Sequence, residues 1–75
     1  MEIRSPLTPA STVLLRWLCL EGLRVESGRP IATLISPQGL LDVAVPCDVR
    51  INELLIAEGD PVEGGTSIAL VAPVD

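Results

Sequence analysis

Few side chains in this chain could act as nucleophiles or carry protons. There is no lysine and no histidine, and the only thiols are those of Cys19 and Cys47. Asp48 follows Cys47 directly, and a neighbouring carboxylate disfavours the thiolate form that reacts. We therefore interpret Cys47 as a buried or half-buried structural residue and Cys19 as a core residue. Free thiols are the expected state of both, with a single bridge between them as the alternative.

Carboxylates are the other groups that could perform acid–base chemistry. The candidates are Asp42, Asp48, Glu53 and Glu58. A general acid and a general base must face one reacting centre, and no spacing among these residues holds two of them around a pocket. We interpret them as solvated surface charges. Without histidine or a pair of closely spaced cysteines, the sequence also predicts no metal site. We expect no catalytic residue, no cofactor and no enzymatic activity.

The composition restricts the classes of partner. The chain has 75 residues with 48% apolar residues, which predicts one small domain over residues 1–75. Its net charge is −5 and Trp17 is its only aromatic residue. Nucleic acid requires cations and stacking surfaces, and anionic membranes also attract cations, so neither is expected as a partner. No signal peptide or membrane span is recognised, and the cytoplasm is the expected location.

An internal repeat organises the chain. Residues 17–32 match residues 54–69 at an offset of 37 positions. Both copies read as an apolar strand, Glu-Gly, two residues, Val-Glu, one residue, Gly, two residues and Ile-Ala. The identical pairs are Leu18/Leu55, Glu21/Glu58, Gly22/Gly59, Val25/Val62, Glu26/Glu63, Gly28/Gly65, Ile31/Ile68 and Ala32/Ala69. Two copies of one unit predict a domain with pseudo-two-fold symmetry, with repeat halves at about 12–37 and 49–73.

The second copy decides how the first one folds. Residues 11–20 alone would also suit a helix, because the hydrophobic periodicity of a short apolar run does not distinguish a helix from a strand. The second copy contains Asp60-Pro61 and Gly64-Gly65, which favour strands and turns. We therefore expect strands in both copies, at about 12–18, 30–35, 40–45, 49–56 and 67–71, within seven or eight in all. Pro6 and Pro9 predict an irregular or edge segment over the first eleven residues.

The centre of the chain predicts a hairpin. Ser36, Pro37 and Gly39 are residues that favour a tight type I turn between two strands, and they place Gln38 at its exposed tip. Each Glu-Gly pair should end a strand in a turn where Gly22 or Gly59 takes a positive φ. Val25 and Val62 should then point inward. The predicted fold is all-β, a flattened barrel or sandwich.

The repeat resembles the lipoyl/biotinyl carrier domains over about residues 3–73. Their usual form has an apolar strand, then Glu-Gly-Asp, a Val two residues on, and a Gly before an aliphatic-Ala strand. The second copy follows it closely with Glu58-Gly59-Asp60-Pro61-Val62. The resemblance implies a flattened barrel of two four-stranded sheets. It also implies that a modified lysine is displayed at the tip of the central hairpin.

This sequence departs from that family at the hairpin tip. Counting without gaps, Gln38 stands where the family has its lysine, and Ile35 and Pro37 replace acidic neighbours. A carboxamide nitrogen is not nucleophilic, so Gln38 cannot be acylated by lipoate or biotin. Ser36 could be considered a phosphopantetheine site, but such serines begin a helix, whereas Ser36 begins a turn. Ser36, Pro37, Gln38 and Gly39 are therefore predicted as a recognition hairpin.

Several functions remain open. The preferred hypothesis is a non-catalytic module of a multi-enzyme system that contacts a protein partner, such as an acyltransferase, dehydrogenase or carboxylase component. The alternative is a true carrier whose lysine is replaced by Gln38, by nature or by engineering. A third is an unrelated protein with the same sandwich, such as part of a membrane fusion protein or a regulatory subunit. Exposed strand edges would also permit a homo-oligomer. Arg16, Arg24 and Arg29 could form a docking patch for carboxylates, although scattered solvated arginines are the simpler interpretation.

Overall fold

The structure is a computed structural model that describes residues 1–8 and 11–74. Residues 1–8 and 11–74 contain seven strands and no helix, as the sequence predicted. The strands are β1 (Glu2–Arg4), β2 (Val13–Trp17), β3 (Arg24–Val25), β4 (Pro30–Ser36), β5 (Gly39–Ala44), β6 (Val49–Leu54) and β7 (Ser67–Pro73). Accordingly, no helix in the described part of the chain is long and apolar enough to cross a membrane.

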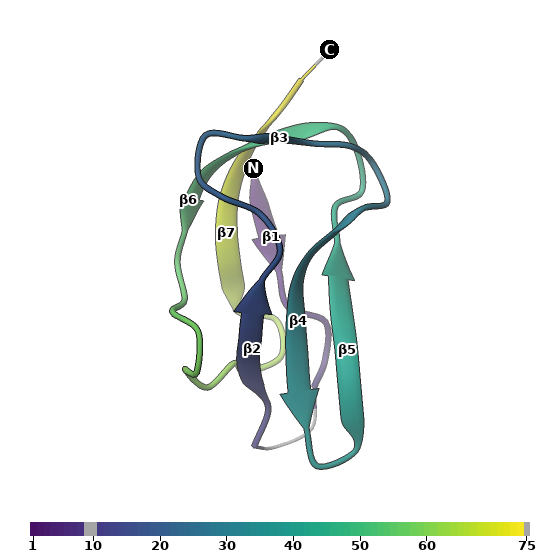
Figure 1. Cartoon of the computed structure of the whole chain (residues 1–75), viewed down its shortest axis with the longest axis vertical. Coiled ribbons are helices and arrows are strands. Elements are labelled where there is room, and N and C mark those ends of the chain that lie inside the picture. Colours follow the sequence, from purple (N-terminus) through teal and green to yellow (C-terminus); the bar gives the residue numbers. More distant parts are fainter. Residues whose placement is uncertain (9–10, 75) are drawn as a thin grey trace.

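The strands form two antiparallel sheets that face each other. One has the order β1-β7-β6-β3 and the other the order β2-β4-β5. Figure 1 shows the turn between β4 and β5 at one end of the molecule and both chain termini at the other. Residues 11–20, which alone would also suit a helix, contain β2, an edge strand of the three-stranded sheet.

The pseudo-two-fold symmetry predicted from the repeat is present in the backbone hydrogen bonds. Gly22 N–H donates to Ile51 O at 2.7 Å, and its equivalent Gly59 N–H donates to Leu14 O at 2.7 Å. The φ angles of these two glycines are +88° and +89°, as the Glu-Gly turns required. The register shifts between Leu14 and Arg16 in β2 recur between Ile51 and Glu53 in β6. The two halves therefore share one backbone plan down to the bulge.

The same symmetry relates the hairpin tip to the chain termini. Gly28 N–H donates to Val45 O and Gly65 N–H donates to Ser5 O, both at 2.9 Å. Strand β1 therefore lies beside β7 as β5 lies beside β4. The position equivalent to the β4–β5 turn lies between β7 and β1. The β4–β5 turn lies at the opposite end of the molecule from the chain termini (Figure 1).

The prediction of two four-stranded sheets is wrong for the second sheet, which has three strands. The expected fourth strand is reduced to one isolated bridge between Pro61 and Val13. Its equivalent in the first repeat is the pair of Arg24 with Arg50 in β3 and β6. The pairing is present in both repeats and is shorter in the second, where Leu14 N–H donates to Asp60 O at 3.0 Å and Val62 N–H donates to Thr12 O at 2.9 Å on either side of the bridge. The two sheets do not close into a barrel, and the arrangement is sandwich-like.

The strand positions agree with the sequence to within two residues at each end. Strand β7 runs on to Pro73 rather than ending at 71, and β6 ends at Leu54 rather than 56. The first eleven residues were expected to be irregular or an edge, and Glu2–Arg4 form the edge strand β1. Pro9 lies outside the described residues. Gly28 and Gly65 lie in turns two residues before β4 and β7.

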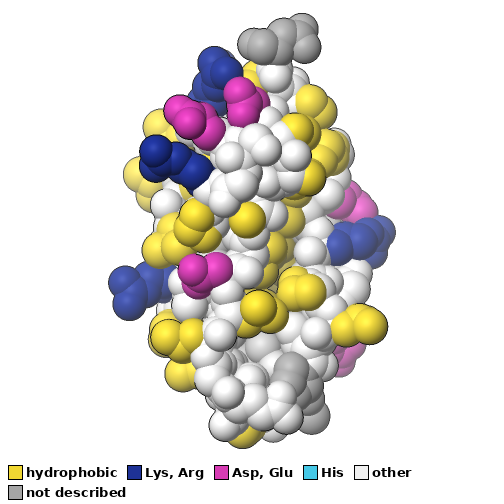
Figure 2. All heavy atoms as spheres, turned by 90° about the vertical axis from the view of Figure 1, so that its right-hand side faces the viewer, with side chains coloured by type: hydrophobic (Ala, Val, Ile, Leu, Met, Phe, Trp, Pro, Cys, Tyr) yellow, Lys and Arg dark blue, Asp and Glu magenta, His cyan; other side chains and the backbone are white. Residues whose placement is uncertain are grey.

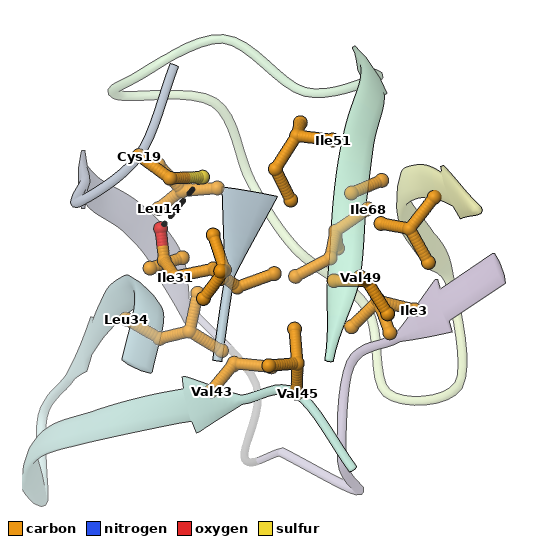
Figure 3. Packing of buried hydrophobic residues seen from close by; sticks show 14 of the residues in the cluster. Ile3, Leu14, Cys19, Ile31, Leu34, Val43, Val45, Val49, Ile51 and Ile68 are labelled. Atoms are coloured by element: carbon orange, nitrogen blue, oxygen red, sulfur yellow. Dashed lines mark hydrogen bonds between the residues drawn. The ribbon is translucent and has the colours of Figure 1, made fainter. Parts of the chain in front are cut away.

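The core lies between the sheets and is almost entirely aliphatic. Figure 3 shows side chains of both sheets pointing toward one another, with Ile31 and Leu34 from β4 facing Val49, Ile51 and Ile68 from the other sheet. The buried apolar residues are Ile3, Leu14, Cys19, Val25, Ile31, Ala32, Leu34, Val43, Val45, Val49, Ile51, Val62, Ile68, Ala69 and Val71. Val25 and Val62, predicted to point inward at equivalent positions, are both buried.

Candidate functional site at the hairpin end

The turn between β4 and β5 exposes the residues that the sequence singled out. Ser36 pairs with Gly39, which leaves Pro37 and Gln38 as the turn. Pro37, Gln38 and Gly39 are exposed and Ser36 is half-buried. The Ser36 hydroxyl accepts a hydrogen bond from Gln38 N–H at 3.2 Å and donates one to Gly39 O at 3.4 Å. The Ser36 side chain therefore braces the turn from within, and Gln38 is exposed at its tip.

The two strands below the turn differ in burial. Strand β4 lies in the middle of its sheet and is buried over residues 31–34, so it anchors the hairpin to the core. Strand β5 lies at the sheet edge, and its first four residues, 39–42, are exposed. Thr33 Oγ1 donates a hydrogen bond to Asp42 Oδ1 at 2.9 Å, which joins the two strands side chain to side chain. The buried central strand β4 thus supports the exposed edge strand β5.

The hairpin end is uncharged and partly apolar. No ionisable side chain occurs in residues 35–41 or in residues 5–8 and 11–15. Leu7 is 92% exposed and Leu40 is 66% exposed. Thr8 and Thr12 line a small cavity together with Gly39 and Leu41, so the segment after β1 lies against the hairpin. In Figure 2, seen from the β5 side, the lowest part of the visible surface shows apolar and neutral side chains, and the charged ones lie above it.

The repeated glutamates have a structural role that the sequence reasoning missed. Glu21 Oε2 accepts a hydrogen bond from Leu54 N–H, and Glu58 Oε2 accepts one from Trp17 N–H, both at 2.9 Å. Each carboxylate therefore binds the backbone of the other repeat just beyond its bulge. Glu58 had been interpreted as a solvated surface charge, and its identity with Glu21 did not single it out, because Glu26 and Glu63 are identical as well.

Two other carboxylates that the sequence singled out, those of Asp42 and Asp48, are each held by hydrogen bonds to neighbouring residues. Asp48 accepts a hydrogen bond from Ser27 N–H at 2.8 Å and forms an exposed ion pair with Arg24 at 3.1 Å. The Ser27 hydrogen bond, followed by the Arg24 guanidinium, lowers the pKa of the Asp48 carboxyl. Asp42 is held by Thr33. These groups brace loops and strands, and each is engaged with a different neighbour.

Both cysteines carry free thiols, as predicted. Cys19 is buried and Cys47 is half-buried against the core. Burial raises the pKa of the Cys19 thiol, which keeps it protonated. Its Sγ contacts Ile31 O at 3.7 Å (Figure 3), an interaction within the core. Cys19 therefore behaves as a small apolar residue.

The described residues contain no group of three or more histidine, cysteine, aspartate or glutamate side chains that could hold a metal ion.

Comparisons with known proteins do not assign this chain to a family. No protein-family model, no curated protein and no solved structure matches it. The hairpin end is the candidate site because of its geometry and its position in the repeat.

Proposed function

We propose that this chain is a non-catalytic domain of lipoyl/biotinyl type that acts through protein contact at its hairpin end. Its partner would be a component of a multi-enzyme system, such as an acyltransferase, dehydrogenase or carboxylase subunit. One observation carries this proposal: the end that projects away from both termini is exposed and uncharged, and it holds no amine.

Three features support the lipoyl/biotinyl architecture within this proposal. The two Glu-Gly units cross-bond each other's strands, as the resemblance would require of a duplicated domain. The central hairpin lies opposite the termini (Figure 1). Gln38 occupies its tip, where the family displays its lysine. The missing eighth strand is the feature that departs from the family's plan, since only an isolated bridge between Val13 and Pro61 stands in its place.

The chemistry of the tip favours contact over group transfer. Acylation by an activated carboxylic acid needs a free amine, and the Gln38 carboxamide nitrogen shares its lone pair with the carbonyl. Pro37 and Leu40 place apolar surface on both sides of Gln38, with Leu40 66% exposed. Apolar surface flanking one hydrogen-bonding amide is suited to recognition by a protein groove.

Contact through the hairpin can be measured directly. With a photo-activated crosslinking amino acid in place of Gln38, we expect the protein in its native host to give a discrete crosslinked product of higher mass. The same amino acid in place of Asn52, exposed on β6, is the matched control and should give none. Adding Leu40→Asp should remove the product, because a carboxylate would have to be desolvated against the partner. Equal products from both sites would contradict the hairpin as the recognition element.

The alternative function is a true carrier in which Gln38 replaces the modified lysine, and the position of Gln38 at the tip is what favours it. We expect the Gln38→Lys variant to gain a lipoyl or biotinyl group when incubated with lipoate ligase or biotin ligase. An Asn52→Lys variant should gain none, since its lysine lies on a strand rather than at a turn. Intact mass spectrometry of both variants checks this.

The protein purified from its native host provides the second half of that measurement. An unmodified mass there, together with modification of Gln38→Lys, supports a carrier scaffold that has lost its anchor. An adduct on the native protein, for example at Cys47 or Ser36, would contradict the non-catalytic contact role. Failure of both ligases to modify Gln38→Lys would contradict the lipoyl/biotinyl type.

A further inference from the structure

A second surface lies at the end of the molecule that holds the termini. The loops that lead from β2 to β3 and from β3 to β4 border a hollow of about 510 Å³. Its lining includes Leu18, Leu23 and Pro30, together with the charged residues Arg24, Glu26 and Arg29. Leu18 is 44% exposed and Leu23 is 51% exposed. Figure 1 shows these loops running across the end opposite the β4–β5 turn, so this surface is separate from the hairpin.

The repeat provides an internal comparison for this surface. Because the halves share one backbone plan, each lining residue has an equivalent 37 positions later. Leu23 corresponds to Asp60, Arg24 to Pro61 and Arg29 to Thr66, while Glu26 corresponds to Glu63. The charged residues at these positions sum to +1 in the first repeat, from two arginines and one glutamate. In the second repeat they sum to −2, from Asp60 and Glu63. One backbone thus carries aliphatic side chains and arginines in the first repeat, where Arg24 is paired with Asp48, and acidic side chains in the second.

The difference between the copies extends into the core beneath them. In the second repeat, Ile56 O accepts a hydrogen bond from Trp17 Nε1 at 2.7 Å, which brings the large indole against that loop. The equivalents of Trp17 and Ile56 are Leu54 and Cys19, which are both smaller. The side chains beneath the first-repeat loop therefore fill less space than those beneath the second-repeat loop. The hollow opens at this place, beside Cys19.

The arginines at the rim are available to an anion. Arg24 gives one guanidinium nitrogen to Asp48, and a guanidinium has further donors to share. Arg29 forms no ion pair within the described part of the chain. A carboxylate beside Arg29 would gain a charge-assisted hydrogen bond, and an apolar side chain next to it could cover Leu18 and Leu23.

We infer that this hollow is a docking surface for an acidic, amphipathic segment of a partner protein, in which carboxylates flank aliphatic side chains. The arginines of the hollow would bind the carboxylates, and its exposed leucines would contact the aliphatic side chains. The inference rests on the proposed role in protein contact, and it adds a surface at the other end of the domain from Gln38. Its openness suits a peptide lying across it rather than an enclosed small molecule.

Fluorescence anisotropy with a short labelled peptide of glutamates and leucines tests this surface. We expect the wild-type protein to bind it at low salt, and to bind a matched peptide of lysines and leucines more weakly. Arg29→Thr, which installs the second-repeat residue, should weaken binding by about five-fold, since an exposed ion pair contributes at most about 1 kcal/mol. Leu23→Asp should weaken it by about ten-fold or more, because it removes an anchor contact and adds repulsion.

Two controls keep these outcomes distinct. Thr66→Ala, at the position equivalent to Arg29, and Gln38→Ala at the hairpin should leave peptide binding unchanged. In NMR spectra of the wild-type protein, the peptide should shift the backbone amide signals of Leu18, Leu23 and Arg29, and leave those of Leu55, Asp60 and Thr66 in place. The two sets occupy equivalent positions in the two repeats, so the signal of each residue in the first repeat can be compared with that of its equivalent in the second.

Three results would overturn the inference. The first is the absence of peptide binding. The second is binding lost in Gln38→Ala but kept in Arg29→Thr, which would leave the proposed function standing at the hairpin. The third is concentration-dependent self-association, seen by sedimentation velocity and abolished by Arg29→Thr, which would make a second copy of the chain the occupant. An adduct on the native protein would instead contradict the proposed function without bearing on this surface.

Discussion

Replacing Ile31 with alanine should destabilise the domain by about 2 to 5 kcal/mol, and replacing Ile68 should cost a similar amount. Both side chains are 0% exposed, and they occupy equivalent places in the two repeats. Ile31 belongs to β4, the central strand of one sheet, and Ile68 to β7 of the other. Removing either one leaves a cavity that neighbouring strands cannot fill without breaking their register. Urea unfolding followed by circular dichroism measures the two free energies.

The comparison between the two variants tests the pseudo-symmetry energetically. A small domain has only a few kcal/mol of stability to lose, so either alanine variant can unfold outright. Ile31→Val and Ile68→Val, at about 0.5 to 1.5 kcal/mol each, provide the measurable pair in that case. Leu40→Ala is the control, because its side chain is 66% exposed and should change stability little. Losses that differ several-fold between Ile31→Val and Ile68→Val would contradict equivalent packing of the halves.

Glu21→Ala and Glu58→Ala should each lower the free energy of unfolding by about 1 to 2 kcal/mol, as expected for a lost hydrogen bond to a charged acceptor that is partly open to water. Each carboxylate accepts the backbone N–H of a residue just beyond a bulge, Leu54 for Glu21 and Trp17 for Glu58. Without the acceptor, that N–H has to find water at the point where the ladder is already interrupted. Urea unfolding of the two variants measures both losses.

The repeat supplies the control for this prediction as well. Glu26 and Glu63 are also identical between the copies, yet their carboxylates accept no hydrogen bond from any residue that the structure describes. Glu26→Ala and Glu63→Ala should therefore stay within about 0.5 kcal/mol of the wild type. If all four variants lost the same stability, net charge rather than the carboxylate–backbone bonds would explain the effect.

The sequence predicted the fold in those places where the two copies supported each other. Residues 11–20 alone did not distinguish a helix from a strand, and the turn residues near Pro61 in the other copy resolved it. The burial of Val25 and Val62 followed from the same alignment of halves, and the exposed tip at Gln38 followed from the turn residues around it. These predictions hold because spacing alone fixes them.

Other features depended on geometry that spacing does not encode. The second sheet ends in an isolated bridge at Pro61 where the first repeat has the strand β3, a difference in backbone pairing that the repeat pattern does not encode. The bonds of Glu21 and Glu58 could not be told from the unbonded pair of Glu26 and Glu63 by identity alone. The hollow beside Arg29 depends on side-chain volumes that meet across the fold.

The edge position of β1 sets the order in which this domain can assemble during synthesis. All three strands of the β2-β4-β5 sheet come from residues 13–44, so that sheet can pair while the second half of the chain is still being made. Strand β1 must wait for β7, and the Met1 amino group reaches Val71 O at 3.0 Å across 70 residues of chain. Contacts of such sequence separation slow folding, and they leave the earliest-made strand unpaired for longest. Strand β1, which is made before the other six strands, is therefore among the last to be secured.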